Sequence, residues 1–254
     1  MTLIASVSGI RGTIGGKINQ NLTPVDVVAF AAAYGSWIKT KYSSATVVVG
    51  RDARISGPMV QTLVQQTLVS LGIDVIDVGL STTPTVEMEV VRKQAQGGII
   101  ITASHNPKQW NALKLLNNKG EFISAEAGAE LMQYVSDQSY DFVGVDDLGK
   151  INVVTDALTA HIDAILGLPQ VNVAAIKAAG FSAVVDGVNS SGGVAVPKLL
   201  EQLGVKVHKI HCTPNGEFPH NPEPLKEHLV DLSAVVTAQH ADLGIAVDLS
   251  LIHI

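Results

Sequence analysis

Short apolar runs alternate with longer amphipathic stretches along the first half of the chain. Residues 46–50 read TVVVG and residues 97–102 read GGIIIT, which is typical of strands buried on both faces. Residues 57–71 carry apolar side chains at helical spacing, and residues 73–78 return to an apolar run. This alternation predicts an α/β fold, in which mostly parallel sheets carry helices on both faces.

Threonine–proline pairs mark two helix starts. A capping hydroxyl at Thr23 precedes Pro24, and the apolar pattern then continues to about residue 38. Thr83 and Pro84 open a second helix toward residue 93. Further helical patterns lie at residues 124–135, 156–166 and 193–203, and further strand patterns at residues 182–186 and 205–210.

A polar, acidic stretch at residues 136–150 shows no clear period and predicts a domain boundary. We expect two consecutive domains of similar layout, at residues 1–140 and residues 155–248. No residue-level repeat of fixed period accompanies them, so the similarity is one of architecture.

Composition excludes several classes of protein. Apolar residues make up 46% of the chain and charged residues 16%, which favours a globular protein over a disordered one. The formal net charge of -6 comes without a basic run, so we expect no nucleic-acid partner. No apolar run approaches the roughly 18 residues of a membrane span. The single cysteine, Cys212, rules out an intramolecular disulfide and fits the cytoplasm, and oligomeric state is not readable from the sequence.

The loop at residues 102–107, TASHNP, directly follows a predicted buried strand. Open α/β sheets bind ligands beyond the carboxyl ends of their strands, so this loop is a candidate site. The hydroxyl of Ser104 is a weak nucleophile without a base, cation or metal, and His105 and Lys114 are the nearest candidates to activate it. The alternative is an ordinary turn, because Ser, Asn and Pro are common turn residues.

Three segments together resemble the signature set of the phosphohexomutase family, whose members act on phosphoglucose, phosphomannose or phosphoglucosamine. They are residues 6–12 (SVSGIRG), 50–52 (GRD) and 102–107 (TASHNP). Their order and separation agree with the family, and the similarity runs to about Asp248. The resemblance implies a phosphoserine at Ser104 that donates its phosphoryl group to a hexose phosphate. The resulting hexose bisphosphate returns its other phosphoryl group, so the net reaction is an isomerisation.

The resemblance also implies roles for three further residues. Arg11 matches an active-site arginine that takes part in proton transfer or phosphate contact, and Lys114 matches the lysine that follows the serine loop. His105 lies beside the nucleophile, where it orients or polarises the phosphate. Arg51 and Asp52 are either substrate contacts or a buried arginine–carboxylate pair that holds the loops together.

The family holds Mg²⁺ through the phosphoserine and three aspartates of a DxDxDR loop. Asp248 matches the first of these aspartates, but residues 249–254 read LSLIHI. Ser104 and Asp248 are therefore the expected metal ligands, too few to hold Mg²⁺ well. We expect an incomplete second domain and a foreign tail at residues 249–254 from a truncated, frameshifted or chimeric reading frame; the alternative is a diverged member that ends in an apolar strand.

The expected activity is that of a phosphoglucosamine mutase, which converts glucosamine 6-phosphate to glucosamine 1-phosphate. Alternatives are a phosphomannomutase or phosphoglucomutase, or an inactive truncated fragment that binds sugar phosphate, and we expect the 254-residue chain to be inactive by itself. A serine hydrolase is disfavoured because no G-x-S-x-G surrounds Ser104, and a dinucleotide-binding domain because no G-x-G-x-x-G follows a strand.

Overall fold

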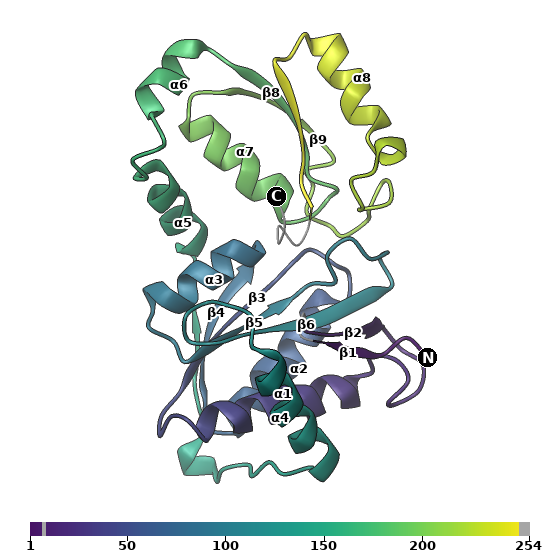
Figure 1. Ribbon diagram of the computed structural model, residues 1–254, viewed down its shortest axis with the longest axis vertical. Coiled ribbons are helices and arrows are strands. Elements are labelled where there is room, and N and C mark those ends of the chain that lie inside the picture. The colour runs from purple at the N-terminus through teal and green to yellow at the C-terminus, as the bar shows by residue number, and fades with distance from the viewer. Residues whose placement is uncertain (7–8, 249–254) are drawn as a thin grey trace.

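The computed structural model describes residues 1–6 and 9–248, and the expected tail at residues 249–254 lies outside these residues. The described chain builds two α/β units, each around its own sheet, one above the other in Figure 1. This arrangement confirms the predicted fold class.

The first unit is built on a mixed sheet that has seven strands among the described residues, in the order β1-β2-β6-β5-β3-β4-β7. The strands are β1 (Ile4–Ser6), β2 (Gly9–Thr13), β3 (Thr46–Arg51), β4 (Asp74–Leu80), β5 (Gly97–Ile101), β6 (Trp110–Leu116) and β7 (Ile151–Val153). Strands β5, β3 and β4 are parallel, as the apolar runs predicted, and β7 joins them in parallel without having been predicted. Strands β1, β2 and β6 add an antiparallel edge that the sequence patterns did not indicate.

Helices cover both faces of this sheet. Helices α1 (Pro24–Lys39), α2 (Gly57–Ser70) and α4 (Ala125–Asp137) lie on one face, and α3 (Thr83–Arg92) lies on the other (Figure 1). Val47, Val49 and Ile99 are buried in the core under α1 and α2. Val48 and Ile100 are buried in a second core under α3. Because successive strand residues point to opposite faces, burial on both faces explains why these strands are continuously apolar.

The helix starts follow local chemistry. Thr23 caps α1 in a capping box with Asp26, with proline at the first helical position. Helix α3 begins one residue earlier than a cap at Thr83 would give. Thr82 is the capping residue, and its side chain accepts a hydrogen bond from the Thr85 backbone N–H.

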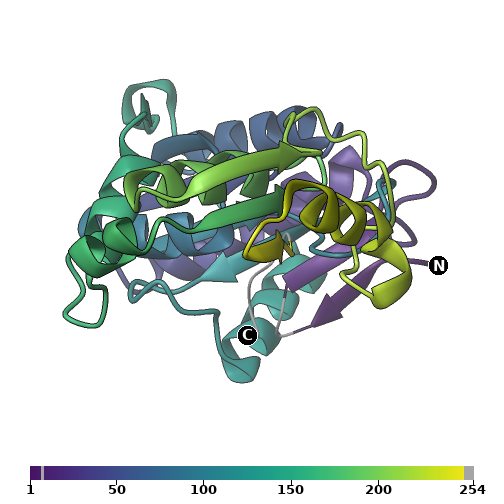
Figure 2. The same ribbon diagram turned by 90° about the horizontal axis from the view of Figure 1, so that it is seen from above.

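The second unit has a smaller sheet, with three parallel strands among the described residues in the order β10-β8-β9. These strands are β8 (Ser182–Asp186), β9 (Lys206–Ile210) and β10 (Leu243–Ala246). Around it lie α5 (Ala157–Leu166), α6 (Val173–Ala179), α7 (Gly192–Gln202) and α8 (Val230–Gln239), with short 3₁₀ turns η1 (Val145–Asp147) and η2 (Lys226–His228). Figure 2 shows this unit from above, with α8 crossing near β10 and the first unit beneath.

The segment between the units packs on the first sheet. Strand β7 pairs with β4, so the sheet extends past residue 140, where we expected the first domain to end. The contacts that join the units include two hydrogen bonds: Ala53 N donates to Ser190 Oγ at 3.2 Å, and Thr85 Oγ1 lies 2.9 Å from His161 Nδ1. None of the described helices has the length and apolar character needed to cross a membrane.

Candidate active site

Ser104 lies in the serine loop, residues 102–109, which connects the carboxyl end of β5 to β6. Its backbone has φ 54°, in the left-handed region that few residues other than glycine adopt. The Ser104 N–H donates to Thr102 Oγ1 at 3.1 Å, and that hydroxyl donates to Asp52 Oδ2 at 2.7 Å. The buried Asp52 therefore anchors the base of the loop and supports the unusual conformation of Ser104.

Arg54 holds the rest of the serine loop through its backbone. The guanidinium donates to four carbonyl oxygens, at distances of 2.6 to 2.9 Å, and these belong to Ser104, Asn106, Pro107 and Trp110. Its Nε is 3.1 Å from Asp52 Oδ2, and both side chains are almost fully buried. A rigid planar fork with five donors suits this task, which an ammonium group cannot match.

A buried arginine–carboxylate pair was one of the two alternatives for Arg51 and Asp52, and the structure forms such a pair between Arg54 and Asp52. Arg51 Nε instead donates to Gln61 Oε1 at 2.9 Å. Burial raises the pKa of Asp52 and lowers that of Arg54, and the attraction between the two charges opposes both shifts. Removing either partner would leave a charge buried without compensation.

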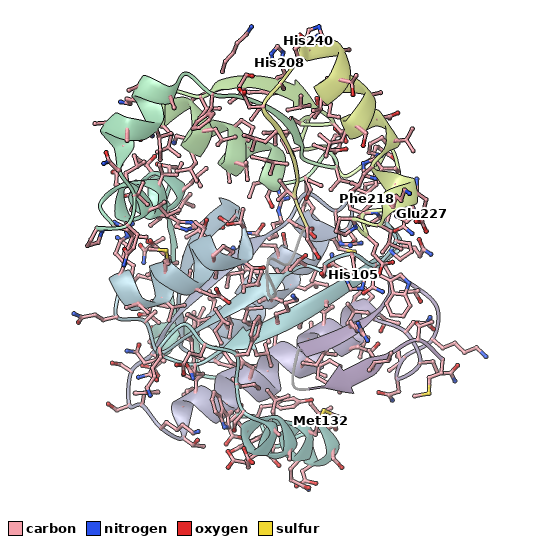
Figure 3. All side chains as sticks on the ribbon, turned by 45° about the horizontal axis from the view of Figure 1, so that its top comes forward. His105, Met132, His208, Phe218, Glu227 and His240 are labelled. Atoms are coloured by element: carbon pink, nitrogen blue, oxygen red, sulfur yellow. The ribbon has the colours of Figure 1, made fainter. Side chains whose placement is uncertain are left out.

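The hydroxyl of Ser104 faces both its own loop and the second unit. Ser104 Oγ donates to Asp248 Oδ1 at 3.2 Å and lies 3.4 Å from His105 Nδ1. Asp248 follows β10, and His105 lies where the two units meet (Figure 3). The fold thus brings together Ser104, His105 and Asp248, three of the residues that the sequence singled out.

Lys114 and Arg11 come from the antiparallel edge of the first sheet. Lys114 on β6 pairs with Ile100 of β5, and Arg11 on β2 pairs with Ala112 of β6. Lys114 is 5% exposed, and desolvation is the main cause that lowers its pKa to about 8. The positive charge of Arg11 lowers it further, whereas Asp248, Glu87 and Asp52 raise it. These couplings place the amine among the charges of the serine site.

Arg11 has an unsatisfied donor. Its Nε is buried and makes no hydrogen bond within the described part of the chain. A buried guanidinium donor without a partner is uncommon in proteins and fits a group that contacts an anionic ligand. All four residues that the sequence proposed as catalytic thus belong to one region of the first unit.

Two residues of this region were not anticipated. Arg54 stands two positions after the GRD segment, and no sequence signal distinguishes it from a solvated loop charge. Glu87 on α3 is electrostatically coupled to Lys114, and burial raises the pKa of its carboxyl. Both roles depend on contacts between segments that are distant in sequence.

The oxygen donors of Ser104 and Asp248 are of the kind that Mg²⁺ prefers. They supply two oxygens, and the described residues add no second carboxylate hydrogen-bonded to Ser104 Oγ. The donor set therefore fits Mg²⁺ in chemical type, with phosphate oxygens and water needed to complete an octahedron.

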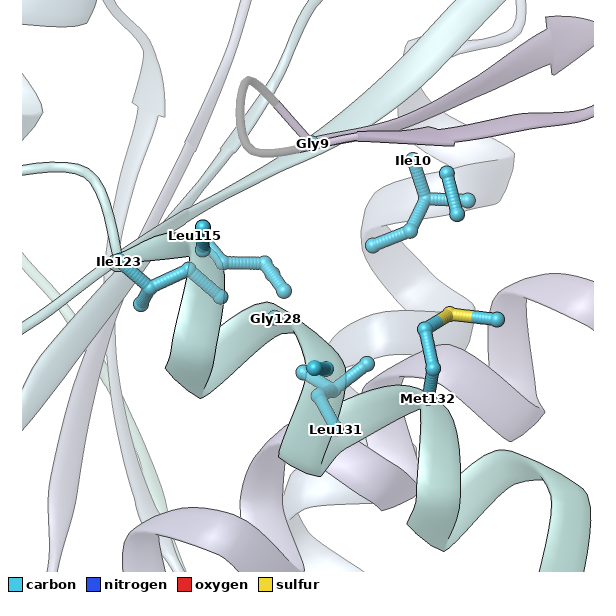
Figure 4. Close-up of a pocket in the computed structure, with 10 residues that line it drawn as sticks. Gly9, Ile10, Leu115, Ile123, Gly128, Leu131 and Met132 are labelled. Atoms are coloured by element: carbon cyan, nitrogen blue, oxygen red, sulfur yellow. The ribbon is translucent and has the colours of Figure 1, made fainter.

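An apolar pocket between β2, β6 and α4 is a separate feature (Figure 4). Ile10, Leu115, Ile123, Leu131 and Met132 are among its lining residues. Because it lacks charged side chains to neutralise a phosphate, it does not suit a sugar phosphate.

Known proteins resemble the chain along most of its length. The model of phosphoglucomutase/phosphomannomutase alpha/beta/alpha domain I matches residues 3–141, and that of domain II matches residues 159–249. A relative from Thermococcus kodakarensis, named phosphoglucomutase/phosphomannomutase, is 36% identical over 241 residues, or 93% of this chain and 52% of the relative. A relative from Methanopyrus kandleri, named probable phosphoglucosamine mutase, is 34% identical over 242 residues, or 95% of this chain and 50% of the relative.

A solved structure of a phosphoglucomutase/phosphomannomutase family protein from Burkholderia thailandensis has the same fold. It aligns with a TM-score of 0.79 at 25% identity, covering 97% of this chain and 54% of the solved one. The chain thus spans about half the length of the relatives that it matches. Two family models and these relatives agree with the serine loop and its surroundings: the chain belongs to the phosphoglucomutase/phosphomannomutase family.

Proposed function

We propose that this chain takes part in phosphoryl transfer between two positions of a hexose phosphate, with Ser104 as the residue that carries the phosphoryl group. The observation that carries the proposal is the 3.2 Å contact between Ser104 Oγ and Asp248, made across the two units of a family member. The serine stands at the end of a rigid strand and is accessible, as a residue that exchanges a phosphoryl group must be.

The reaction has two balanced halves. A hydroxyl oxygen of the hexose phosphate attacks the phosphorus of phosphoserine and gives its proton to a base, while the bond from phosphorus to Ser104 Oγ breaks and Ser104 Oγ takes up a proton. The product is a hexose bisphosphate. In the second half Ser104 Oγ gives its proton to a base and attacks the other phosphorus of the bisphosphate, the bond from that phosphorus to the sugar oxygen breaks, and the sugar oxygen takes up a proton.

Lys114 and Arg11 supply the charge and proton transfer for these steps. An amine with a pKa of about 8 exchanges protons readily near neutral pH, which suits Lys114 as the acid or base. Arg11, whose Nε lacks a partner among the described residues, donates to the phosphate oxygens. His105, 3.4 Å from Ser104 Oγ, orients the phosphoryl group.

Ser104 and Asp248 would hold Mg²⁺ through oxygen, and the ion would neutralise charge on the transferred group. Because one carboxylate among the described residues accompanies the serine, we infer that the 254-residue chain binds Mg²⁺ weakly. Low activity of this chain by itself follows from the same shortage of ligands. Hydrogen bonding by Arg54, in contrast, keeps the serine loop in place without any ion.

We propose glucosamine 6-phosphate as the substrate, with mannose and glucose phosphates as alternatives. Relatives named probable phosphoglucosamine mutase at 31–34% identity support the first, and the relative at 36% identity, named phosphoglucomutase/phosphomannomutase, supports the others. A chain that binds sugar phosphate without turnover is the second candidate, favoured by the finding that residues 1–6 and 9–248 place one carboxylate beside Ser104.

The test is Mg²⁺-dependent conversion of glucosamine 6-phosphate, mannose 1-phosphate and glucose 1-phosphate, each primed with its bisphosphate. Both this chain and the full-length product of its gene are assayed, with Ser104→Ala as the inactive control. Turnover that depends on Ser104 supports the mutase and identifies its substrate. Saturable binding of sugar phosphate without turnover in either protein would replace the mutase by the binding role.

A further inference from the structure

One carboxylate and two imidazoles meet at the carboxyl end of the second sheet. Asp186 ends β8, His211 directly follows β9, and His220 lies in the loop at residues 212–222. One ligand atom from each of the three lies within 4.8 Å of the others. The phosphoryl transfer proposed above uses none of them.

The contacts within this cluster converge on one carboxylate oxygen. Asp186 Oδ2 lies 3.2 Å from His211 Nδ1 and 2.9 Å from His220 Nε2, while Asp186 Oδ1 accepts from Val188 N at 2.9 Å. The Asp186 side chain is 2% exposed, and those of His211 and His220 are 23% and 18% exposed. A buried carboxylate is thus covered by two rings that solvent ions can reach.

The position of the hydrogen on the His220 ring favours a cation in this cluster. Its Nδ1 lies 2.8 Å from the carbonyl oxygen of Asn221, which only accepts, so Nδ1 carries the hydrogen. In a neutral ring the lone pair is then on Nε2, directly opposite the Asp186 oxygen. Two electron pairs in that position repel each other unless a proton or a metal cation lies between them.

The second histidine has the same arrangement of partners. His211 Nδ1 faces Asp186, and its Nε2 lies 3.7 Å from Asp231 Oδ2. Histidines that bind metals usually direct the other ring nitrogen to a carboxylate or a backbone carbonyl, which fixes the ring and raises its basicity. His220 directs Nδ1 to a carbonyl oxygen at hydrogen-bond distance, and His211 directs Nε2 toward the Asp231 carboxylate at ion-pair distance.

The backbone around Asp186 is held in strained conformations. Val188, Asn189 and His211 have φ values of 45°, 52° and 47°, and for the β-branched Val188 this region is rarely adopted. Such conformations persist only where the surrounding structure fixes them, and they concentrate at ligand sites.

We propose that Asp186, His211 and His220 bind a divalent cation of the zinc class. Two imidazole nitrogens and one carboxylate oxygen are typical ligands of Zn²⁺, whereas Mg²⁺ prefers oxygen alone. Three protein ligands leave one tetrahedral position for water. The neighbouring Cys212 is not a ligand, because its Sγ donates to the carbonyl oxygen of Ile210 at 3.1 Å.

A bound ion would stabilise the loop at residues 212–222, which packs beside the serine site. It would tie the loop at residues 212–222 to β8 and β9, and this loop also touches the first unit. The Arg54 guanidinium lies 5.1 Å from the ring centroid of Phe218, and a Cβ on Gly216 would lie 2.2 Å from the carbonyl oxygen of Ala53. The role of the ion is therefore structural, because it fixes a loop that packs against Ala53 and Arg54, next to the serine loop.

The test is a titration of the purified chain with Co²⁺, followed by its visible absorption, and with Zn²⁺ by calorimetry. Excess Mg²⁺ is present throughout to occupy sites made of oxygen. We expect about one Co²⁺ per chain, displaced by Zn²⁺, and a rise in melting temperature on binding. Ser104→Ala should bind Co²⁺ as tightly as the parent, and loss of binding in that variant would assign the ion to the serine loop and overturn the proposal.

His211→Asn and His240→Asn form a matched pair of variants. Both histidines have a left-handed backbone, with φ 47° and 49°, which asparagine tolerates. His240 ends α8 at the far end of the second unit from His105 (Figure 3). His211→Asn should weaken Co²⁺ binding at least about tenfold, and His240→Asn should leave it unchanged.

Two further results would overturn the proposal: no saturable Co²⁺ binding by the parent chain, or equal affinity in the parent and in His211→Asn. If His211→Asn fails to fold, His220→Gln serves in its place. That residue has no positive φ, so its replacement tests the ligand without backbone strain.

Discussion

Arg54 Nη2 donates a 2.6 Å hydrogen bond to the carbonyl oxygen of Ser104. A charged donor inside the protein thus fixes the backbone, and not the hydroxyl, of the proposed phosphoryl carrier. The hydroxyl remains available for chemistry while its position is set by a residue fifty positions earlier in the chain. Arg54 acts as a positioning residue for the serine loop.

Replacing Arg54 should damage both stability and the serine loop. Arg54→Met leaves Asp52 buried without its partner, which we expect to reduce the free energy of unfolding by about 3–5 kcal/mol. Urea unfolding measures this loss of stability. The phosphoserine content of the purified protein shows whether the serine loop still holds Ser104 in position. Lys108→Met is the control, since the Lys108–Glu217 pair is exposed and its removal should change stability by less than about 1 kcal/mol.

The double variant Asp52→Asn/Arg54→Met separates the destabilisation caused by burying an unpaired charge from that caused by losing the other contacts of Arg54. It removes both charges, so it should be less destabilised than Arg54→Met alone. Equal or greater destabilisation would show that the ion pair does not account for the loss.

Ser104→Ala should abolish phosphorylation and turnover. The purified parent should carry a phosphate at residue 104, detectable by mass spectrometry of its peptides, and the variant should carry none. Activity of the full-length product should fall by about three orders of magnitude or more, because the nucleophile is lost. The exposed Ser139 provides the control variant, Ser139→Ala, and phosphate found only on residues other than Ser104 would contradict the assignment.

Lys114 should make stability depend on pH. Its folded pKa of about 8 lies below the ordinary value of 10.5, so between these values the unfolded chain binds more protons than the folded one. The free energy of unfolding contributed by this residue therefore rises with pH from about 8 to 10.5. Lys114→Met should remove that rise. At pH 7, where burying the charge is most unfavourable, its free energy of unfolding should exceed that of the parent by up to about 3 kcal/mol.

Urea unfolding of both proteins at pH 7 and pH 9.5 checks this prediction. The exposed Lys119 is the matched control, and Lys119→Met should follow the parent at both pH values. The same difference between parent and Lys114→Met at the two pH values would mean that Lys114 is not desolvated in solution. The activity of the full-length Lys114→Met protein should be lost regardless of its stability.

The contact between the loop at residues 212–222 and the first unit should tolerate no side chain at residue 216. Gly216 has φ +75°, and an added Cβ would lie 2.2 Å from the carbonyl oxygen of Ala53. Gly180 has φ +65° with nothing within 4 Å of an added Cβ. Both Gly→Ala changes carry the cost of a left-handed alanine, about 1–2 kcal/mol, and Gly216→Ala should lose more. Urea midpoints measure the difference, and equal losses would argue against a close contact in solution.

Local sequence patterns predicted those strands and helices whose residues share one environment along their whole length. The strand at residues 46–50 is apolar because α1, α2 and α3 cover both of its faces. The start of α1 is readable because its capping residue, Thr23, bonds to Asp26 within the first turn. Strands β1, β2 and β6 lacked such a signal. Arg11 and Lys114 interrupt the apolar pattern, because these strands carry charged groups of the site.

The α/β alternation and the serine loop at the end of a buried strand can be read from the sequence, because helical period, apolar runs and turn residues are properties of neighbouring positions. Which distant groups meet depends on the tertiary structure. Asp248 reaches Ser104, Arg54 replaces Arg51 as the partner of Asp52, and His211 and His220 converge on Asp186. These contacts depend on how sheets and loops pack in three dimensions, where separation along the chain no longer limits which side chains touch.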